Sequence, residues 1–160
     1  MTTGVGMYRS VGAASSRVKT ALFEQITTAL AADVVGVDIA FGFRWPAQYP
    51  DEVAVTAVRA TDVGEGTVSP ERRRQVEVSV DVSIVSFRVT DDERVPHDRA
   101  YGLLDVIDAH LREDPTLDGA ALWCLSDDLA SDGATHEEEA QEGRICEVSV
   151  TFAARVIVTR

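Results

Sequence analysis

The stretch Arg144–Arg160 reads RICEVSVTFAARVIVTR and alternates between apolar and polar side chains. Its even positions, from Cys146 to Val158, are all apolar, whereas Glu147 and Arg155 are among the polar side chains at the odd positions. A β-strand sends successive side chains to opposite faces. The pattern therefore predicts a long strand with one buried face and one face that meets water or a partner.

A second long stretch, 73–89, alternates in the same way, with apolar side chains at the even positions of Val76–Ile84. Beyond Ile84 the apolar side chains move to odd positions. One extra residue in a strand shifts every later side chain to the other face, which predicts a β-bulge or bend near Ser83–Ser86. Alternatively, the far end of the strand protrudes and buries its other face against another chain. The odd-numbered apolar residues are Val85, Phe87 and Val89.

The rest of the chain supplies two helices and shorter strands. One helix is predicted from an N-cap at Ser15 or Ser16 to about residue 32, and a second from Pro96 to about Glu113. Strands are predicted at 34–43, 52–60 and 120–125. The order α-β-β-β-α-β-β with short connections predicts an α+β fold, in which two helices cover one face of a mainly antiparallel sheet.

Three segments define the expected domain organisation. Residues 1–14 are small and glycine-bearing, which predicts a loose N-terminal arm. Residues 15–160 are expected to form a single domain, because a chain of this length buries one core without a disulfide. Within that domain, residues 126–143 are strongly acidic and are expected to form a mobile loop or hairpin tip between the last two strands.

Composition limits the possible functions. The chain has 160 residues and a formal net charge of −12, which opposes tight binding to nucleic acid and favours solubility. No apolar run is long enough to span a bilayer, and the N-terminus has no apolar signal sequence, so a cytosolic site of synthesis is expected. Cys124 and Cys146 are far apart in apolar runs, which predicts buried free thiols; a disulfide between neighbouring strands is the alternative.

No motif for catalysis or cofactor binding is present. The three histidines, His97, His110 and His136, lack a second ligand at a metal-binding spacing, although an adventitious ion beside His136 is an alternative. Cys146 falls on the buried parity of its strand and has no base nearby in the sequence, which argues against a nucleophile. We therefore expect neither an enzyme nor a bound cofactor or metal.

Two short segments are candidates for contacts with other proteins. Trp45 and Tyr49 lie in a segment with Pro46 and Pro50 that cannot be regular structure, and they form either a cap on the core or a contact patch. Arg72, Arg73 and Arg74 form the densest basic cluster. They are either a solvated strand start or an ionic contact with an acidic patch on a neighbouring copy, which salt would weaken.

The whole pattern resembles the tail terminator (minor tail) proteins of phages with long non-contractile tails, lambda-type, especially those of actinobacterial hosts. The resemblance covers about residues 15–160. It rests on the order of the elements, on the helical segment RAYGLLDVI at 99–107 and the turn DPTLDG at 114–119, and on a closing strand entered through Gly143 and Arg144.

The resemblance implies a structural virion protein. Tail terminators assemble as a ring, typically of six copies, on the head-proximal end of the tail tube. They stop tube polymerisation and present a surface to the head-completion (connector) proteins, while DNA passes through the lumen without specific binding and no membrane is involved. On this reading Trp45, Tyr49 and Arg72 to Arg74 contact neighbouring copies or the adjacent ring. The lumen or an axial face then carries Asp127, Asp128, Glu137, Glu138 and Glu139.

Three rival functions make different predictions. Another neck protein or a tube protein would form open-ended stacks rather than one ring. A small enzyme or ligand-binding domain would be a monomer or dimer whose activity depends on His97, His110 or Cys146. An acidic DNA mimic would bind a DNA-handling protein through residues 126–143.

Overall fold

The fold was analysed in a computed structural model, which describes residues 4–32, 36–43, 50–63, 73–138 and 141–159, with side chains described outside 134–138 and 141–142. Two helices and a six-stranded sheet make up this part of the chain. In chain order the elements are β1 (Met7–Tyr8), α1 (Val11–Ala31), β2 (Val37–Phe41), β3 (Asp51–Asp62), β4 (Arg73–Arg88), α2 (Arg94–Glu113), β5 (Trp123–Glu138) and β6 (Gln141–Thr159).

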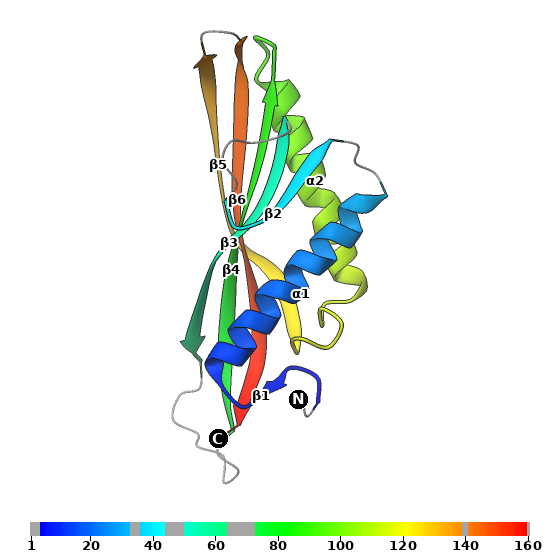
Figure 1. The fold of residues 1–160 in the computed structure, drawn as a ribbon, viewed down its shortest axis with the longest axis vertical. Coiled ribbons are helices and arrows are strands. Elements are labelled where there is room, and N and C mark those ends of the chain that lie inside the picture. Colours follow the sequence, from blue (N-terminus) through cyan, green and yellow to red (C-terminus); the bar gives the residue numbers. More distant parts are fainter. Residues whose placement is uncertain (1–3, 33–35, 44–49, 64–72, 139–140, 160) are drawn as a thin grey trace.

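The sheet is long, twisted and covered on one side (Figure 1). Its strands follow the order β1-β6-β4-β3-β2, and β5 pairs with β6 along the same edge as β1. Both helices lie on one side of the sheet, as the sequence predicts, and they pack against β3, β4, β5 and β6. The other side of β4 and β6 has no described helix over it.

The core follows the even positions of β4 and β6. These strands pair antiparallel without interruption, so that Val78 faces Ala154, Val80 faces Phe152 and Val82 faces Val150. All six side chains are buried beneath the helices. Burying a valine or phenylalanine side chain contributes about 1.5–3 kcal/mol, so this double row is a principal source of stability.

The expected bulge near Ser83–Ser86 is wrong, because β4 keeps its register with β6 from Arg73 to Arg88. The bulges lie instead in the two flanking strands, between Val55 and Val58 of β3 and between Ser126 and Asp128 of β5. Both lie level with Asp81 of β4, and we call this level the waist of the sheet. Bulges increase local twist, which fits this position.

The sheet is mixed rather than wholly antiparallel. β1 pairs with β6 and β2 pairs with β3 in parallel, whereas the remaining pairs are antiparallel. Residues 42–50 connect β2 to β3, and a connection of that length is long enough to return the chain to the starting end of a five-residue strand. The expectation of antiparallel neighbours assumed connections too short to return the chain to the starting end of the strand. The connection from β2 to β3 is long enough to do so.

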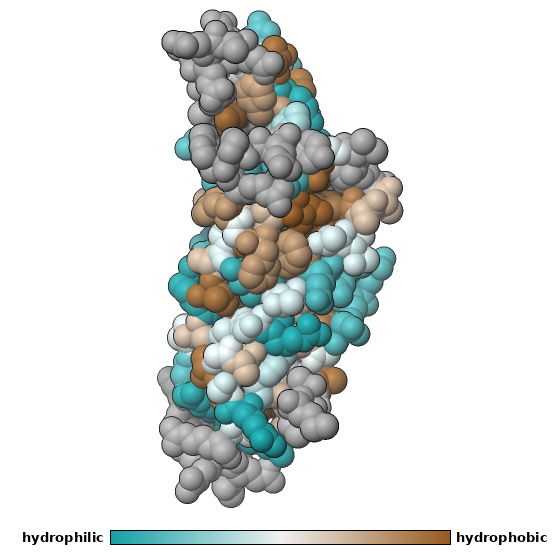
Figure 2. All heavy atoms as spheres, viewed as in Figure 1, coloured by the Kyte–Doolittle hydropathy of each residue, from teal (hydrophilic) through white to brown (hydrophobic). Residues whose placement is uncertain are grey.

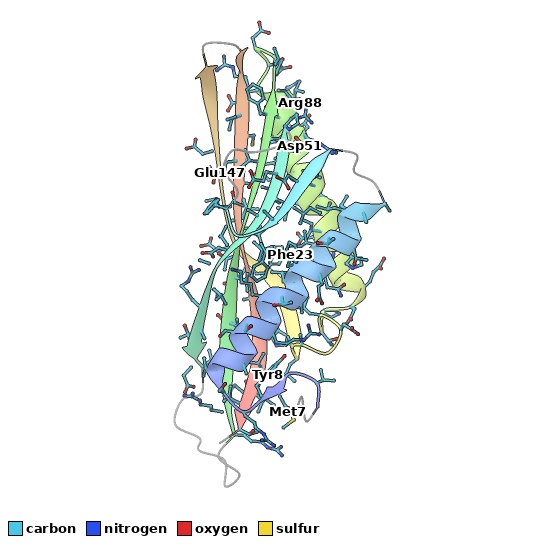
Figure 3. All side chains as sticks on the ribbon, in the orientation of Figure 1. Met7, Tyr8, Phe23, Asp51, Arg88 and Glu147 are labelled. Atoms are coloured by element: carbon cyan, nitrogen blue, oxygen red, sulfur yellow. The ribbon has the colours of Figure 1, made fainter. Side chains whose placement is uncertain are left out.

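The N-terminal segment is docked from residue 4 onward, which corrects the expectation of a loose arm. The hydroxyl of Tyr8 donates to the carbonyl of Ala120 at 2.6 Å, and the amide of Ile157 donates to the carbonyl of Gly6 at 2.7 Å. Ser10 caps α1 by accepting from the Ala13 amide at 3.1 Å, so the helix starts five residues or so before the predicted caps. Figure 3 shows Met7 and Tyr8 beside the lower end of the sheet.

Of the two expectations for the acidic segment 126–143, a mobile loop or a hairpin tip, the structure shows the hairpin, with strands that extend through most of the segment. Most of it belongs to β5 and β6, which pair from Trp123 with Arg155 to Glu138 with Gln141. Acidic residues are poor strand formers by propensity, but every residue of β5 except Asp127 in the bulge gains a ladder partner on β6. The predicted short strand at 120–125 therefore continues to Glu138.

Candidate assembly surface

The uncovered face of the sheet carries paired charges. Asp81 of β4 accepts two hydrogen bonds from Arg59 of β3, at 2.6 and 2.8 Å, and one from Thr151 of β6 at 2.9 Å. The hydrogen bonds from Arg59 are the largest cause of a lowered Asp81 pKa, with that from Thr151 also lowering it and burial opposing them. The Asp81 carboxylate therefore stays charged and ties three strands together at the waist.

A second polar cluster lies further along the same face. Arg155 of β6 donates to Glu77 at 3.3 Å and to Gln75 at 3.1 Å, and its guanidinium lies 5.3 Å from the centre of the Trp123 ring. Partly exposed pairs of this kind contribute little to stability, about 1 kcal/mol or less each. They do, however, neutralise Glu77 and Asp81 on this face, which suits a surface that another molecule covers.

Between these clusters and the free end of β2 the face is hollowed. The depression has a volume of about 560 Å³ and spans β3, β4 and β6. Glu147 accepts from Ser83 at 3.3 Å within it, and Phe43, which is 78% exposed, forms part of its rim. Its lining includes Phe43, Thr56, Asp81, Ser83, Glu147 and Ser149. Its floor therefore holds two carboxylates, Asp81 paired with Arg59 and Glu147 bonded to Ser83.

Exposed aromatic side chains gather near β2. Phe41 is 53% exposed, although its ring meets Phe23 of α1 edge-to-face at 5.4 Å and Lys19 lies 4.3 Å above it. Figure 2 shows hydrophobic side chains at mid-height in the view, over β2 and the adjoining part of α1, on the side of the sheet that the helices cover. Together with Phe43 they give the edge of the sheet an apolar character that is unusual for a surface in contact only with water.

A buried ionic cluster sits where β3 begins and β4 ends. Asp51 is 4% exposed and accepts from Ser86 at 2.8 Å, from Arg88 at 2.7 and 2.9 Å, and from Arg99 of α2 at 2.9 Å. Figure 3 shows Asp51 and Arg88 together on this part of the fold. Burial alone would raise the pKa of Asp51, but the hydrogen bonds from Arg88, Arg99 and Ser86 outweigh it and the pKa is lowered.

This cluster explains the apparent change of parity in β4. Ser86 and Arg88 occupy inward positions, because Asp51 needs polar partners there, while Val85 and Phe87 remain on the outer face. Sequence reasoning read the apolar residues and missed the polar inward ones. The available signal was that Ser86 and Arg88 continue the even positions of the five inward apolar residues in Val76–Ile84. Polar side chains in that phase indicate a buried polar partner.

The thiols and imidazoles show no catalytic arrangement within the described residues. Cys124 and Cys146 are buried and free, as predicted, and burial raises the pKa of Cys124 to about 12. Burial also raises the pKa of Cys146, with a hydrogen bond from Ser131 opposing it. His110 bonds to Gln25 at 2.8 Å and His97 stacks on Tyr101, and no group of three possible metal ligands occurs in this part of the chain.

Only some of the predicted contact residues can be placed. Arg73 and Arg74 are exposed at the start of β4, where Arg74 pairs with Asp62 at 3.3 Å. Asp127 and Asp128 are exposed at and beside the bulge of β5. The structure therefore separates the basic and acidic candidates onto different strands. Glu137 and Glu138 belong to β5 without described side chains, and Trp45, Tyr49, Arg72 and Glu139 lie outside the described residues.

One chain from the virion of a native gene transfer agent particle matches with a TM-score of 0.49 and 9% sequence identity, over 90% of this chain and 97% of that chain. No protein-family model matches the sequence. No curated protein matches it either. No helix in the described residues is both long and apolar enough to cross a membrane.

Proposed function

We propose that this protein is a structural virion protein, a tail terminator that forms a ring on the head-proximal end of a phage tail tube. The observation that supports it is the uncovered sheet face. β4 and β6 bury one face under two helices and leave the other without a described helix, with the ion pairs of Arg59 and Arg155 on it and Phe43 exposed at the rim of its hollow. Such a surface fits assembly with other protein chains better than it fits catalysis.

The finer part of the proposal comes from the sequence. The order of elements and the DPTLDG turn at 114–119 resemble the tail terminators, and the turn is a defined structure here. The carboxylate of Asp114 accepts from the Thr116 and Asp118 amides at 3.1 and 3.0 Å, and Leu117 is fully buried. The net charge of −12 suits a lumen through which DNA slides without sticking. Partners on this proposal are the tail tube protein and a head-completion protein, with no enzymatic activity.

Removal of the gene from the phage genome that carries it tests the function directly. Without a terminator, tube polymerisation has no stop and no surface for the head, so electron micrographs should show over-long tubes and heads without tails. Complementation with the wild-type gene is the control. Tails of normal length on attached heads would overturn the proposal.

Light scattering and electron microscopy of the purified protein separate the terminator from the tube-protein alternative. A terminator should stop at a single closed ring, because its interfaces are used up when the rotation closes. Open-ended stacks that lengthen with concentration would favour the tube protein instead.

A further inference from the structure

The two edges of the sheet are unlike each other, and among the described strands neither is paired along its whole length. On one side β5 pairs only with β6, so its outer edge has no partner among the described strands. On the other side β2 covers β3 only as far as Val55, so no described strand continues the ladder on that edge of β3 beyond Val55. Long open edges present unpaired backbone groups and are sites for pairing with another chain.

The two edges lie at the same level of the sheet. Ser126 of β5 is opposite Phe152, which is opposite Val80, which in turn is opposite Val58 of β3. The bulges in β3 and β5 also share one level, so both edges bend at the same height. A rotation about an axis along the strands leaves levels unchanged. It would therefore bring residues 56–62 of one copy beside residues 123–128 of the next.

Strand direction favours the same contact. Each of the pairs β3–β4, β4–β6 and β6–β5 is antiparallel, so β5 runs opposite to β3 within one copy. The same rotation keeps strand directions, which makes β5 of one copy antiparallel to β3 of its neighbour. Antiparallel ladders are the more stable kind, and the contact joins two different edges, as a closed ring requires.

The two edges carry opposite charges at this level, and each also has a partly exposed apolar side chain. The β5 edge carries Asp127 and Asp128, both exposed, and Leu125, which is 51% exposed. The β3 edge carries Arg59, whose side chain is 57% exposed, and Val58, which is 37% exposed. Arg59 reaches Asp81, which Thr151 also bonds, and Thr151 is opposite Asp128. The guanidinium therefore lies at the height of the Asp128 carboxylate of an adjoining copy.

We propose that copies of this chain associate through an intermolecular antiparallel ladder between β5 residues 123–128 of one copy and β3 residues 56–62 of the next, with Asp128 and Arg59 forming an ion pair across it. The inference deepens the proposed ring by naming its lateral contact. In this arrangement residues 123–128 of β5 lie at the contact between copies rather than on the lumen. Asp127 and Asp128, assigned by resemblance to the lumen or an axial face, here serve the contact between copies.

Two charge reversals and their mixture test the contact by solution mass. Asp128→Arg should abolish association at the β5 edge, and Arg59→Glu should abolish it at the β3 edge. Mixing the two variants should restore association. At one kind of contact Asp128 of one variant meets Arg59 of the other, as in the wild type. At the other kind, the arginine introduced at position 128 meets the glutamate introduced at position 59. Thermal melting checks that each variant is folded.

Matched controls separate this from general charge effects. Asp105→Arg changes an exposed residue of α2 by the same charge as Asp128→Arg, and Arg17→Glu breaks another surface ion pair, with Glu24 at 3.6 Å. Both controls should keep the wild-type mass. A wild-type protein that is monomeric at its highest soluble concentration, or variants that associate normally, or a mixture that fails to recover, would overturn the ladder.

The outcomes also separate this inference from the proposed function. A ring that survives both reversals overturns the ladder and leaves the terminator proposal standing. Conversely, a protein that associates through these edges, but whose gene is dispensable for tail length and head attachment, keeps the ladder and overturns the terminator proposal.

Discussion

Asp51 lies at the start of β3 with 4% of its surface exposed, and it is the acceptor for Ser86, Arg88 and Arg99. Replacing it with alanine would leave two guanidinium groups in a partly buried site without their carboxylate. Breaking a buried ion pair costs about 3–5 kcal/mol, and we expect the low end because the arginine side chains are 31% and 35% exposed. Urea unfolding of Asp51→Ala measures this, with Asp105→Ala as a surface control. A loss no larger than the control's would contradict the prediction.

The same residue should govern part of the acid sensitivity. Burial raises the pKa of Asp51, but the hydrogen bonds from Arg88, Arg99 and Ser86 lower it by more. The pKa therefore lies below the ordinary value of 3.8. A carboxyl whose folded pKa is depressed contributes its full stability above its unfolded pKa and loses it as pH falls through the folded value.

We therefore expect the difference in free energy of unfolding between wild type and Asp51→Asn to be full at neutral pH and to shrink below about pH 4. Urea titrations at a series of pH values measure it. A difference that stays constant down to the acid limit would show that the carboxylate charge is not what Ser86, Arg88 and Arg99 recognise.

At the scale of elements, β1 depends on a single glycine. Gly6 has φ +61°, and a Cβ built on it would lie 2.7 Å from the Leu122 amide nitrogen and 2.9 Å from the Ala121 carbonyl carbon. Gly6→Ala should therefore separate β1 from β6 and cost about 1–3 kcal/mol, whereas Gly12→Ala in α1 should cost nothing or stabilise slightly. Urea unfolding and amide exchange at Ile157, which donates to Gly6, measure both effects. Equal behaviour of the two variants would contradict the close approach.

The hairpin of β5 and β6 shows a similar dependence on close packing. Gly143 lies beneath the Phe87 ring and beside the Arg88 carbonyl, and a Cβ there would be 2.5 Å from each. Phe87 thus uses its outer-face position to cover the neighbouring strand. This contact holds the entry to β6 against the end of β4, which keeps the two strands paired beyond the helices.

At the scale of the whole molecule, charge should control nucleic-acid contact. With a net charge of −12, few cations are available to release counterions from phosphate, so the protein should not retard duplex DNA even at about 50 mM salt. A gel-shift titration measures this, with a basic DNA-binding protein as the positive control. Retardation that disappears with added salt would show a basic patch on the assembled protein and would contradict a non-sticking lumen.

Alternation in 73–88 and 144–159 was enough to predict the two central strands, their buried faces and the side that the helices cover. The reason is that a strand's side-chain period is local and a buried face demands apolar residues wherever it occurs. The two helices and the buried free thiols follow from the same local rules. The α+β class was accordingly determined by the sequence alone.

Contacts between distant residues decided the rest. The inward turn of Ser86 and Arg88 depends on Asp51, which is more than thirty residues earlier, and the docking of β1 depends on Ala120 and Ile157. The acidic segment is a strand because it pairs with β6. Val58 and Ser126 share one level on opposite edges of the sheet only because β3, β4, β6 and β5 are aligned. The periodicity of the sequence determines to which face of a strand a side chain points. Which residues it contacts there depends on segments that are distant in the sequence and that only the tertiary structure brings together.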